Sequence, residues 1–207
     1  MTLTLAPLIA FAVLAVASVA CAAGAPQVAI DQIGSLAVIQ QNGTGNHASI
    51  DQSNGSGDAT LDQNGAGNSA DVTQSGSGFG HATIGQDGAA NVANLVQSGG
   101  SNTLVLGQSG TGNQASLQQT SAPGGGNVAL IGQAGAGNSA SLAQTGDDNT
   151  ALQTQIGDGD AQSLVQNGDN NFAAYSQIGN NLPDLAIRQS GGMSITIIQT
   201  GSPFGGH

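Results

Sequence analysis

The sequence predicts an all-β fold: a β-solenoid of about fifteen short strands in two stacked parallel sheets, with two strands in each rung of about 22 residues. Three observations lead to this prediction. A Gln recurs at nearly constant spacing, a Gly-rich turn follows each Gln, and apolar residues occupy alternate positions before the next Gln. Each unit therefore describes one short strand and one tight corner.

The recurrent glutamine sets the period of the chain. Fifteen glutamines leave fourteen intervals, of which ten are 11 residues long, two are 12, one is 14 and one is 10. Such regularity indicates a repeat architecture in which each unit stacks on its neighbours. The glutamines are Gln41, Gln52, Gln63, Gln74, Gln86, Gln97, Gln108, Gln119, Gln133, Gln144, Gln155, Gln166, Gln177, Gln189 and Gln199.

Between the turns, each unit has the period-two pattern of a half-buried strand. In one unit Ala48 and Ile50 alternate with His47, Ser49 and Asp51. Successive side chains of a strand point to opposite faces, so an Ala followed two residues later by Ile, Leu or Val forms an interior face. The other face carries mostly Ser, Thr, Asp, His and Gln and is expected to contact water.

The Gln and Asn residues that flank each strand are also expected to point inward, because an even number of positions separates them from the apolar residues. Stacked rungs would align them into ladders in which one side-chain amide donates to the next and so satisfies buried polar groups. The residues expected in this self-assembly ladder are Ser35, Gln41, Asn46, Gln52, Gln63, Asn68, Gln74, Gln86, Asn91, Gln97, Gln108, Asn113, Gln119, Gln133, Asn138 and Gln144.

Pairs of glycines mark the corners between strands. Glycine has no Cβ and adopts the backbone conformations that tight corners require. The expected turn glycines are Gly43, Gly45, Gly65, Gly67, Gly110, Gly112, Gly135 and Gly137. An insertion at residues 120–126 lengthens one corner and is expected to be a surface loop.

The domain organisation is simple. Residues 1–22 are expected to be a secretory signal peptide, because an almost wholly apolar run ends in small residues of A-x-A type around Cys21. Residues 23–34 form a short N-terminal segment, residues 35–199 the solenoid and residues 200–207 a C-terminal tail. Cys21 is the only cysteine, so no internal disulfide can form. A retained membrane helix and a lipidated Cys21 stay open as alternatives.

Composition argues against several classes of function. With 34 Gly and 6% charged residues, the chain lacks the varied core and charged surface of an enzyme, and neither catalysis nor a cofactor is expected. The net charge is −11 and the only basic side chain is Arg188, so nucleic acid is not an expected partner. His47, His81 and His207 fall in different units without ligand spacing, and no metal site is predicted.

One stretch of the repeat matches a known family pattern in full. Ser35, Gln41, Gly43, Gly45, Asn46, Ala48 and Gln52 reproduce the curlin repeat S-x5-Q-x-G-x-G-N-x-A-x3-Q. The later units repeat most of it in tandem, so the chain resembles a curlin, the subunit of bacterial curli. The resemblance covers about 165 residues, nearly all of the chain after the expected signal.

The resemblance implies a secreted functional-amyloid subunit that self-assembles into extracellular fibres on the cell surface, for adhesion and biofilm matrix. It also implies the partners: further copies of the chain, a curli-type nucleator or major subunit, an outer-membrane export pore and accessory secretion factors. The repeat itself suggests how growth occurs, because the end strands of a solenoid expose unpaired backbone groups that can pair with another copy. A soluble, capped adhesive solenoid, or one that binds calcium or ice, is the alternative.

Some units depart from the curlin pattern. Asn stands in place of the leading Ser at Asn102, Asn127, Asn149 and Asn171. Gln153 and Gln162 occupy inward positions that are apolar or Ala elsewhere, and Asp160 replaces an Asn. Pro183 stands near a strand start, and proline has no N–H to donate, so the carboxyl end is expected to be the less regular one.

Overall fold

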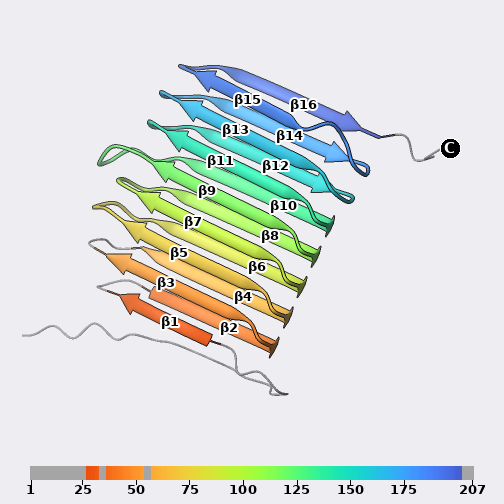
Figure 1. Cartoon of the computed structure of the whole chain (residues 1–207). Coiled ribbons are helices and arrows are strands. Elements are labelled where there is room, and N and C mark those ends of the chain that lie inside the picture. The colour runs from red at the N-terminus through yellow and green to blue at the C-terminus, as the bar shows by residue number, and fades with distance from the viewer. Residues whose placement is uncertain (1–26, 33–35, 54–56, 202–207) are drawn as a thin grey trace, which may run out of the picture.

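The computed structural model describes residues 27–32, 36–53 and 57–201, and these residues form a two-sheet β-solenoid (Figure 1). The described residues contain sixteen strands and no helix. Odd-numbered strands form one eight-stranded sheet and even-numbered strands the other, and every neighbouring pair that is hydrogen-bonded runs parallel. The prediction of a two-sheet parallel solenoid is confirmed, with one strand more than the expected fifteen.

The odd sheet contains β1 (Gln27–Gln32), β3 (His47–Ser53), β5 (Ser69–Ser75), β7 (Val92–Ser98), β9 (Gln114–Thr120), β11 (Ser139–Thr145), β13 (Ala161–Asn167) and β15 (Leu185–Ser190). The even sheet contains β2 (Leu36–Thr44), β4 (Asp58–Ala66), β6 (His81–Ala89), β8 (Thr103–Thr111), β10 (Val128–Ala136), β12 (Thr150–Ile156), β14 (Phe172–Ile178) and β16 (Ser194–Thr200). One odd strand and the even strand that follows it make one rung.

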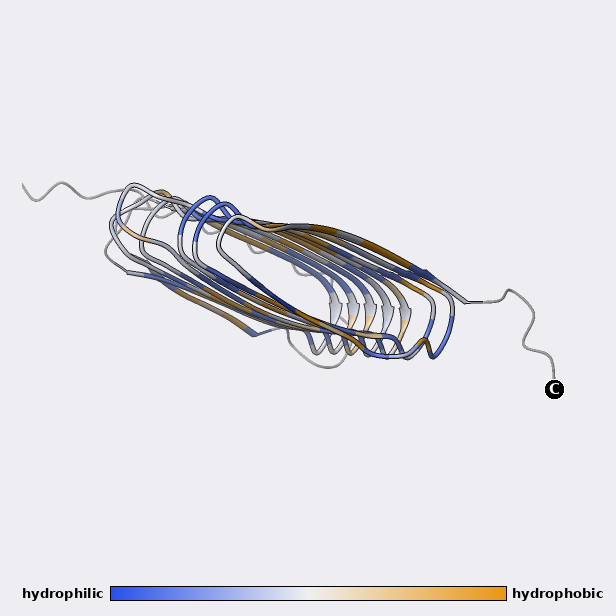
Figure 2. Ribbon diagram, turned by 90° about the horizontal axis from the view of Figure 1, so that it is seen from above, coloured by the Kyte–Doolittle hydropathy of each residue, from blue (hydrophilic) through white to orange (hydrophobic). Residues whose placement is uncertain are grey.

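The register places equivalent residues of successive rungs on top of one another. Gln41 pairs with Gln63, which in turn pairs with Gln86, although the second interval is one residue longer than the first. The extra residue is taken up outside the strands, so the pairing is not shifted. Viewed from above, the stack is flat, with two thin layers joined by turns at both sides (Figure 2).

The core lies between the two sheets and follows the predicted alternation. Ile50, Val72, Leu95, Leu117 and Leu142 stack in register in the odd sheet, and each is 2% exposed or less. Ala residues two positions earlier form a second buried column beside them. The small Ala and the larger aliphatic residue together fill a thin interior, and the predicted face assignment is confirmed.

The additional strand, β1, lies inside the segment 23–34 that was expected to precede the solenoid. It pairs with β3 in the same register as the repeats, so that Ile30 aligns with Ile50 and Gln32 with Gln52. Its sequence carries an inward Val28 and Ile30 without a preceding Gly-rich turn, which explains why the repeat grammar does not reveal it. The stack therefore begins one strand earlier than Ser35, which itself lies outside the described residues.

The insertion forms a surface loop from residue 122 onward, as predicted, whereas Thr120 is the last residue of β9 and Ser121 is buried. Ala122, Pro123 and Gly124 are exposed, and the backbone N–H of Ala122 donates to Asp147 Oδ1 at 2.9 Å in the next rung. The strand after the loop regains the common register, since Val128 pairs with Thr103 on one side and Thr150 on the other. Added length at a corner leaves the sheets undisturbed.

The last rung is less regular than the others, but the irregularity is smaller than the sequence predicts. Pro183 lies before β15, outside the strands, where its missing N–H removes no ladder bond. Ile187 and Ile197 are only partly buried, because no further described rung covers them. The glutamine column continues without a break into β15, with Gln166 Nε2 donating to Gln189 Oε1 at 2.8 Å.

The corner glycines are required by both conformation and space. All eight predicted turn glycines have positive φ, from +65° at Gly45 to +121° at Gly135. At Gly110, where φ is +114°, a Cβ would overlap the carbonyl oxygen of Gly135 in the next corner. Residues with a Cβ rarely adopt this backbone conformation, and the stacked corners leave no room for a side chain.

We predict that Gly110→Ala lowers the free energy of unfolding by at least about 2 kcal/mol, since it adds backbone strain to a steric overlap. Gly107→Ala is the matched control on the same strand, β8, where φ is not positive and nothing lies within 4 Å of an added Cβ. Its free energy of unfolding should be unchanged or slightly raised. Denaturant titration followed by circular dichroism measures both, and equal losses would contradict the crowding of the corners.

Candidate functional site: amide ladders and the ends of the stack

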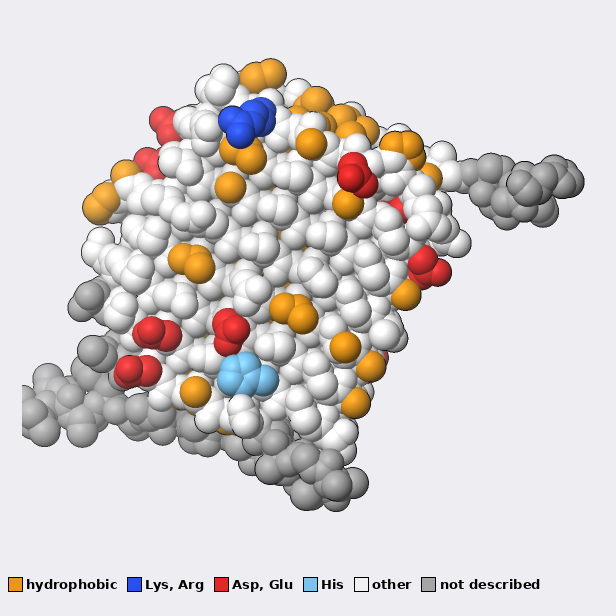
Figure 3. Space-filling view, viewed as in Figure 1, with side chains coloured by type: hydrophobic (Ala, Val, Ile, Leu, Met, Phe, Trp, Pro, Cys, Tyr) orange, Lys and Arg blue, Asp and Glu red, His pale blue; other side chains and the backbone are white. Residues whose placement is uncertain are grey.

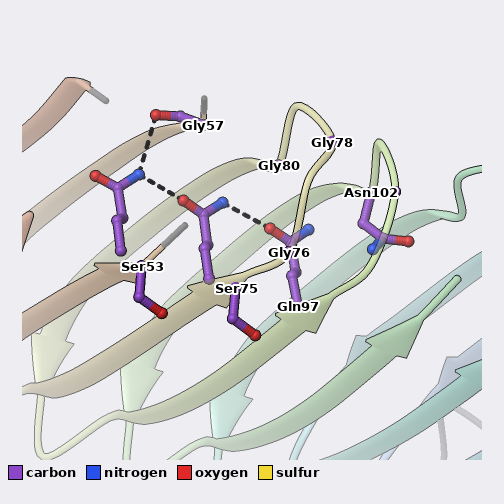
Figure 4. Close-up of a pocket in the computed structure, with 11 residues that line it drawn as sticks. Ser53, Gly57, Ser75, Gly76, Gly78, Gly80, Gln97 and Asn102 are labelled. Carbon is purple, nitrogen blue, oxygen red and sulfur yellow. Dashed lines mark hydrogen bonds between the residues drawn. The ribbon is translucent and has the colours of Figure 1, made fainter. Parts of the chain in front are cut away.

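Two continuous ladders of glutamine side chains run through the core, one in each sheet. In the even sheet each Nε2 donates to the Oε1 of the next rung, from Gln41 to Gln199, over distances of 2.7–3.3 Å. In the odd sheet the same chain runs from Gln52 to Gln189 at 2.6–2.8 Å. Figure 4 shows its first bonds, from Gln52 through Gln74 to Gln97, close to the corner glycines.

The second N–H of most ladder glutamines ties the two sheets together. Gln63 Nε2 donates to the backbone carbonyl of His47 at 2.9 Å, and Gln86 donates to Ser69 at 3.0 Å, each across to the opposite sheet. These glutamines are 5% exposed or less, so leaving the amide unpaired would cost about 1–3 kcal/mol per group. The ladders therefore hold the rungs together along the stack and across it.

The asparagine columns at the corners contain the expected amide-to-amide bonds, such as Asn91 Nδ2 to Asn68 Oδ1 at 3.2 Å and Asn113 Nδ2 to Asn91 Oδ1 at 3.2 Å, and they also bind the backbone. Asn46 Oδ1 accepts from the backbone N–H of Asn68 at 3.0 Å, and Asn68 Oδ1 accepts from that of Asn91 at 3.0 Å. Asn68 Nδ2 donates to the carbonyls of Asn64 and Gly88, both at 3.1 Å. Asn is shorter than Gln and sits where strand pairing stops, so its side chain serves the unpaired backbone of the corner.

The ladders contain residues that the predicted set leaves out. Gln155, Gln166, Gln177, Gln189 and Gln199 continue the glutamine columns, and Asn102, Asn127, Asn149 and Asn171 form a second asparagine column at the opposite corner. The glutamine spacing alone identifies the first group. The second group was visible only as a departure from the curlin Ser. Ser35, which was also predicted, lies outside the described residues.

Asp160 breaks the first asparagine column chemically. Its Oδ1 still accepts from the backbone N–H of Leu182 at 2.9 Å, but its Oδ2 is buried and has no hydrogen-bond partner. In the preceding rung Asn138 Nδ2 donates to Ala134 and Gly157 at 3.3 and 2.7 Å. A carboxylate has no N–H to offer, so the corresponding carbonyls of the next rung lack that donor.

A small polar cluster interrupts the core nearby. Gln153 and Gln162 are 1% and 3% exposed, as their inward positions predict, and the Oε1 of each lacks a hydrogen-bond partner. Tyr175 pairs with Gln153 in register, and its buried hydroxyl also lacks a partner. Burial raises the pKa of this hydroxyl above its ordinary value, so it stays neutral at physiological pH. The core around Gln153, Gln162 and Tyr175 is therefore less apolar than the rest.

The glutamine ladders have a direction, and their two ends therefore differ. Every ladder Nε2 donates towards the carboxyl end, so Gln41, the first glutamine of the even column, presents an acceptor at the other end, and its Oε1 is buried without a partner. Gln52 Oε1 in the odd sheet is also buried without a partner. At the far end Gln199 accepts from Gln177 at 2.9 Å and is the last residue of its column. The even column thus has a free acceptor, Gln41 Oε1, at its first residue and the side-chain amide of Gln199 at its last.

Other kinds of site find little support in the part of the chain that the structure describes. No group of three or more His, Cys, Asp or Glu side chains there could hold a metal ion. His47 lies 3.6 Å from Asp71 on the outer face of the odd sheet, and both side chains are about half exposed. No helix long and apolar enough to cross a membrane occurs among the described residues. The predicted signal, Cys21 and His207 lie outside them.

Comparisons of the chain with known protein families, with curated proteins and with solved structures find no match. The site is therefore interpreted from its own geometry.

We predict that Asp160→Asn raises the free energy of unfolding by about 1–3 kcal/mol, because the new Nδ2 supplies the missing donor at the corner. Asp62→Asn, on the exposed face of β4, removes the same charge without touching the column and is the control. Denaturant titration at neutral pH compares the two. If Asp62→Asn stabilises the chain as much, the gain comes from the lower net charge, and the missing N–H donor at residue 160 is not the cause.

Proposed function

We propose that this chain is a secreted structural subunit that polymerises end to end into an extracellular amyloid fibre of the curli type, for adhesion and biofilm matrix. The observation that carries the proposal is the directed glutamine ladder, whose first residue ends in an unpartnered acceptor. On this proposal the partners are further copies of the chain and the nucleation and export factors that the curlin resemblance implies.

The backbone at the two ends supports the same mechanism. Among the described residues, β1 and β2 have a strand neighbour on one side only, as do β15 and β16. Parallel pairing at about 4.8 Å continues only if the added strand runs in the same direction, so the end of one copy accepts the start of the next in one orientation. The joint repeats the contact that already exists between rungs inside the chain.

The side chains match at such a joint in the even sheet. Gln199 ends its column with an amide, and Gln41 begins the column with a buried Oε1 that lacks a donor. Placing β2 of the next copy on β16 lets Gln199 Nε2 donate to Gln41 Oε1, which extends the ladder through the joint. The reverse orientation would set donors against donors or acceptors against acceptors.

Fibre formation by the purified chain without its predicted signal tests the proposal directly. We expect thioflavin fluorescence to rise after a lag, the lag to shorten on seeding, and oriented fibres to diffract at about 4.8 Å along the fibre axis. A chain that stays monomeric at high concentration and keeps its β circular dichroism would be a soluble solenoid, and the proposal would be wrong.

The ladder at the joint has its own test. We predict that Gln41→Ala slows seeded elongation about tenfold, since one buried neutral hydrogen bond contributes about 1–1.5 kcal/mol. Gln199→Ala should slow it similarly, because both residues meet at the same joint. Gln40→Ala, the outward neighbour on β2, is the control. Elongation rates measured on parental seeds decide the matter, and a Gln41→Ala rate equal to that of Gln40→Ala would mean that the ladder does not extend across the joint.

A further inference from the structure

The two broad faces of the stack have different chemistry. The outer face of the odd sheet carries Asp51, Asp71, His47 and Arg188 among mostly small polar residues. Figure 3 shows this face, identified by the chain's only basic group, in blue, with scattered acidic and apolar side chains on a largely white surface. Of the described large apolar residues that are exposed, Val96 is the only one at an outward position on the odd sheet, since Val28 of β1 aligns with the inward Ala48.

The outer face of the even sheet is uncharged over five consecutive strands. Its outward residues on β8, β10, β12, β14 and β16, which we call the uncharged face, include no Asp, His or Arg. Seven large apolar side chains on it are 38–70% exposed: Val105, Val128, Leu130, Ile156, Phe172, Ile178 and Ile198. Exposed apolar side chains that gather on one uncharged surface indicate that a partner covers it.

A glycine-floored groove runs along the even sheet from β4 to β12. Asp62 and Asp87 line it on β4 and β6, and from β8 onward it lies on the uncharged face. Gly85, Gly107 and Gly132 stack in register, and the groove above them has a volume of about 550 Å³. None of the three has positive φ, and nothing lies within 4 Å of an added Cβ, so neither conformation nor packing within the chain requires glycine there. Glycine in a strand interior weakens the strand, and it is typical of places where another backbone approaches closely.

We propose that two copies of this chain pack face to face through the uncharged face. Two chains of net charge −11 repel each other wherever their Asp residues meet. Electrostatics therefore favours the uncharged face as the place where two copies can touch. The uncharged face brings no like charges together, whereas pairing through the odd face would bring the Asp51 and Asp71 carboxylates of two copies into one interface. The pairing is separate from end-to-end growth and does not depend on it.

A twofold axis parallel to the stack makes the face complementary to itself. If the axis runs between the column of Val105 and Leu130 and the column of Gly107 and Gly132, each bulky residue of one copy lies over a glycine of the other. At the two margins Phe172 of one copy then lies over Ile178 of the other. In such a pair the facing strands of the two copies run antiparallel, while the two stacking axes are parallel. A paired stack can therefore still add copies at one end.

The same axis also brings polar groups that border the face together. It places His81 of one copy over Asp87 of the other, because the two residues lie equally far from the axis in the outward row on β6. Over its five strands, β8 to β16, the uncharged face measures about 24 by 23 Å from strand spacing and rise. A pair would cover about 1,100 Å² in total, which is just above the minimum of about 1,000 Å² for a specific interface and below the usual size, and a polymer would repeat this area in every copy.

Charge substitutions at facing positions test the pairing. Leu130→Asp should halve the mass per unit length of fibres measured by scanning transmission electron microscopy, because it places a carboxylate in the groove of the partner. Mixing Leu130→Asp with Gly132→Lys chains should restore the parental value, since the new carboxylate and ammonium face each other. Mixing Leu130→Asp with Leu130→Lys should not, because position 130 faces position 132 and not itself.

Ser116→Asp on β9, on the opposite face, is the matched control and should leave the mass per length unchanged. Circular dichroism of each variant confirms that the solenoid is intact, and Val105→Asp with Gly107→Lys replaces the first pair if either fails to fold. If the chain forms no fibres, sedimentation equilibrium measures whether the parental chain and each variant are dimers or monomers, and the same comparisons apply. A parental fibre one stack wide, or a parental monomer in that case, would overturn the pairing. So would equal effects of Ser116→Asp and Leu130→Asp, or failure of the facing pair to restore association.

Discussion

In-register stacking of identical rungs is the constraint on which the rest of the structure depends. A glutamine that lies over a glutamine can donate to it, an Ala over an Ala closes the gap between sheets, and a glycine over a glycine lets the corners nest. Each contact is modest by itself. The register repeats them from rung to rung, and an unpaired polar group in the buried core is costly.

The corners absorb the irregularities that the register cannot accept. Insertions of one residue after β5 and of three after β9 change the length of the chain between strands and leave the pairing of β6 and β10 unaltered. The positive-φ glycines and the asparagine side chains accomplish this, because they satisfy the backbone where strand pairing stops. Substitutions inside the rung are less easily accommodated: Asp160, Gln153 and Gln162 leave buried oxygens without partners.

Repetition along one axis also gives the stack a direction and two unlike faces. The even ladder begins with an unpartnered acceptor and ends with an amide, and in the proposed end-to-end addition the joint between copies repeats the contact between rungs. Charges gather on the odd face, on the first even strands and at the corners, and they leave one neutral surface on β8 to β16. The two proposals, growth at the ends and pairing at the neutral face, use different surfaces and are compatible in one assembly.

The sequence by itself determined the period, the inward and outward faces and the position of the corners. These follow from local rules, since alternation fixes which side chains share a face and glycine pairs mark where the chain must turn. The buried column of Ile50, Val72 and Leu95 was predictable for this reason, as were the glutamine ladders. The resemblance to curlins suggested a function on the same repeats, and it remains a proposal.

Only the tertiary structure decided what depends on neighbours in the stack. The sequence does not show that β1 joins the odd sheet, because its pairing depends on β3 and not on a repeat motif. The backbone bonds of Asn46 and Asn68, the missing donor at Asp160 and the direction of the ladders all depend on how one rung lies on the next. The neutral face is also a product of stacking, since Val105, Leu130 and Phe172 come from separate units that the register brings together.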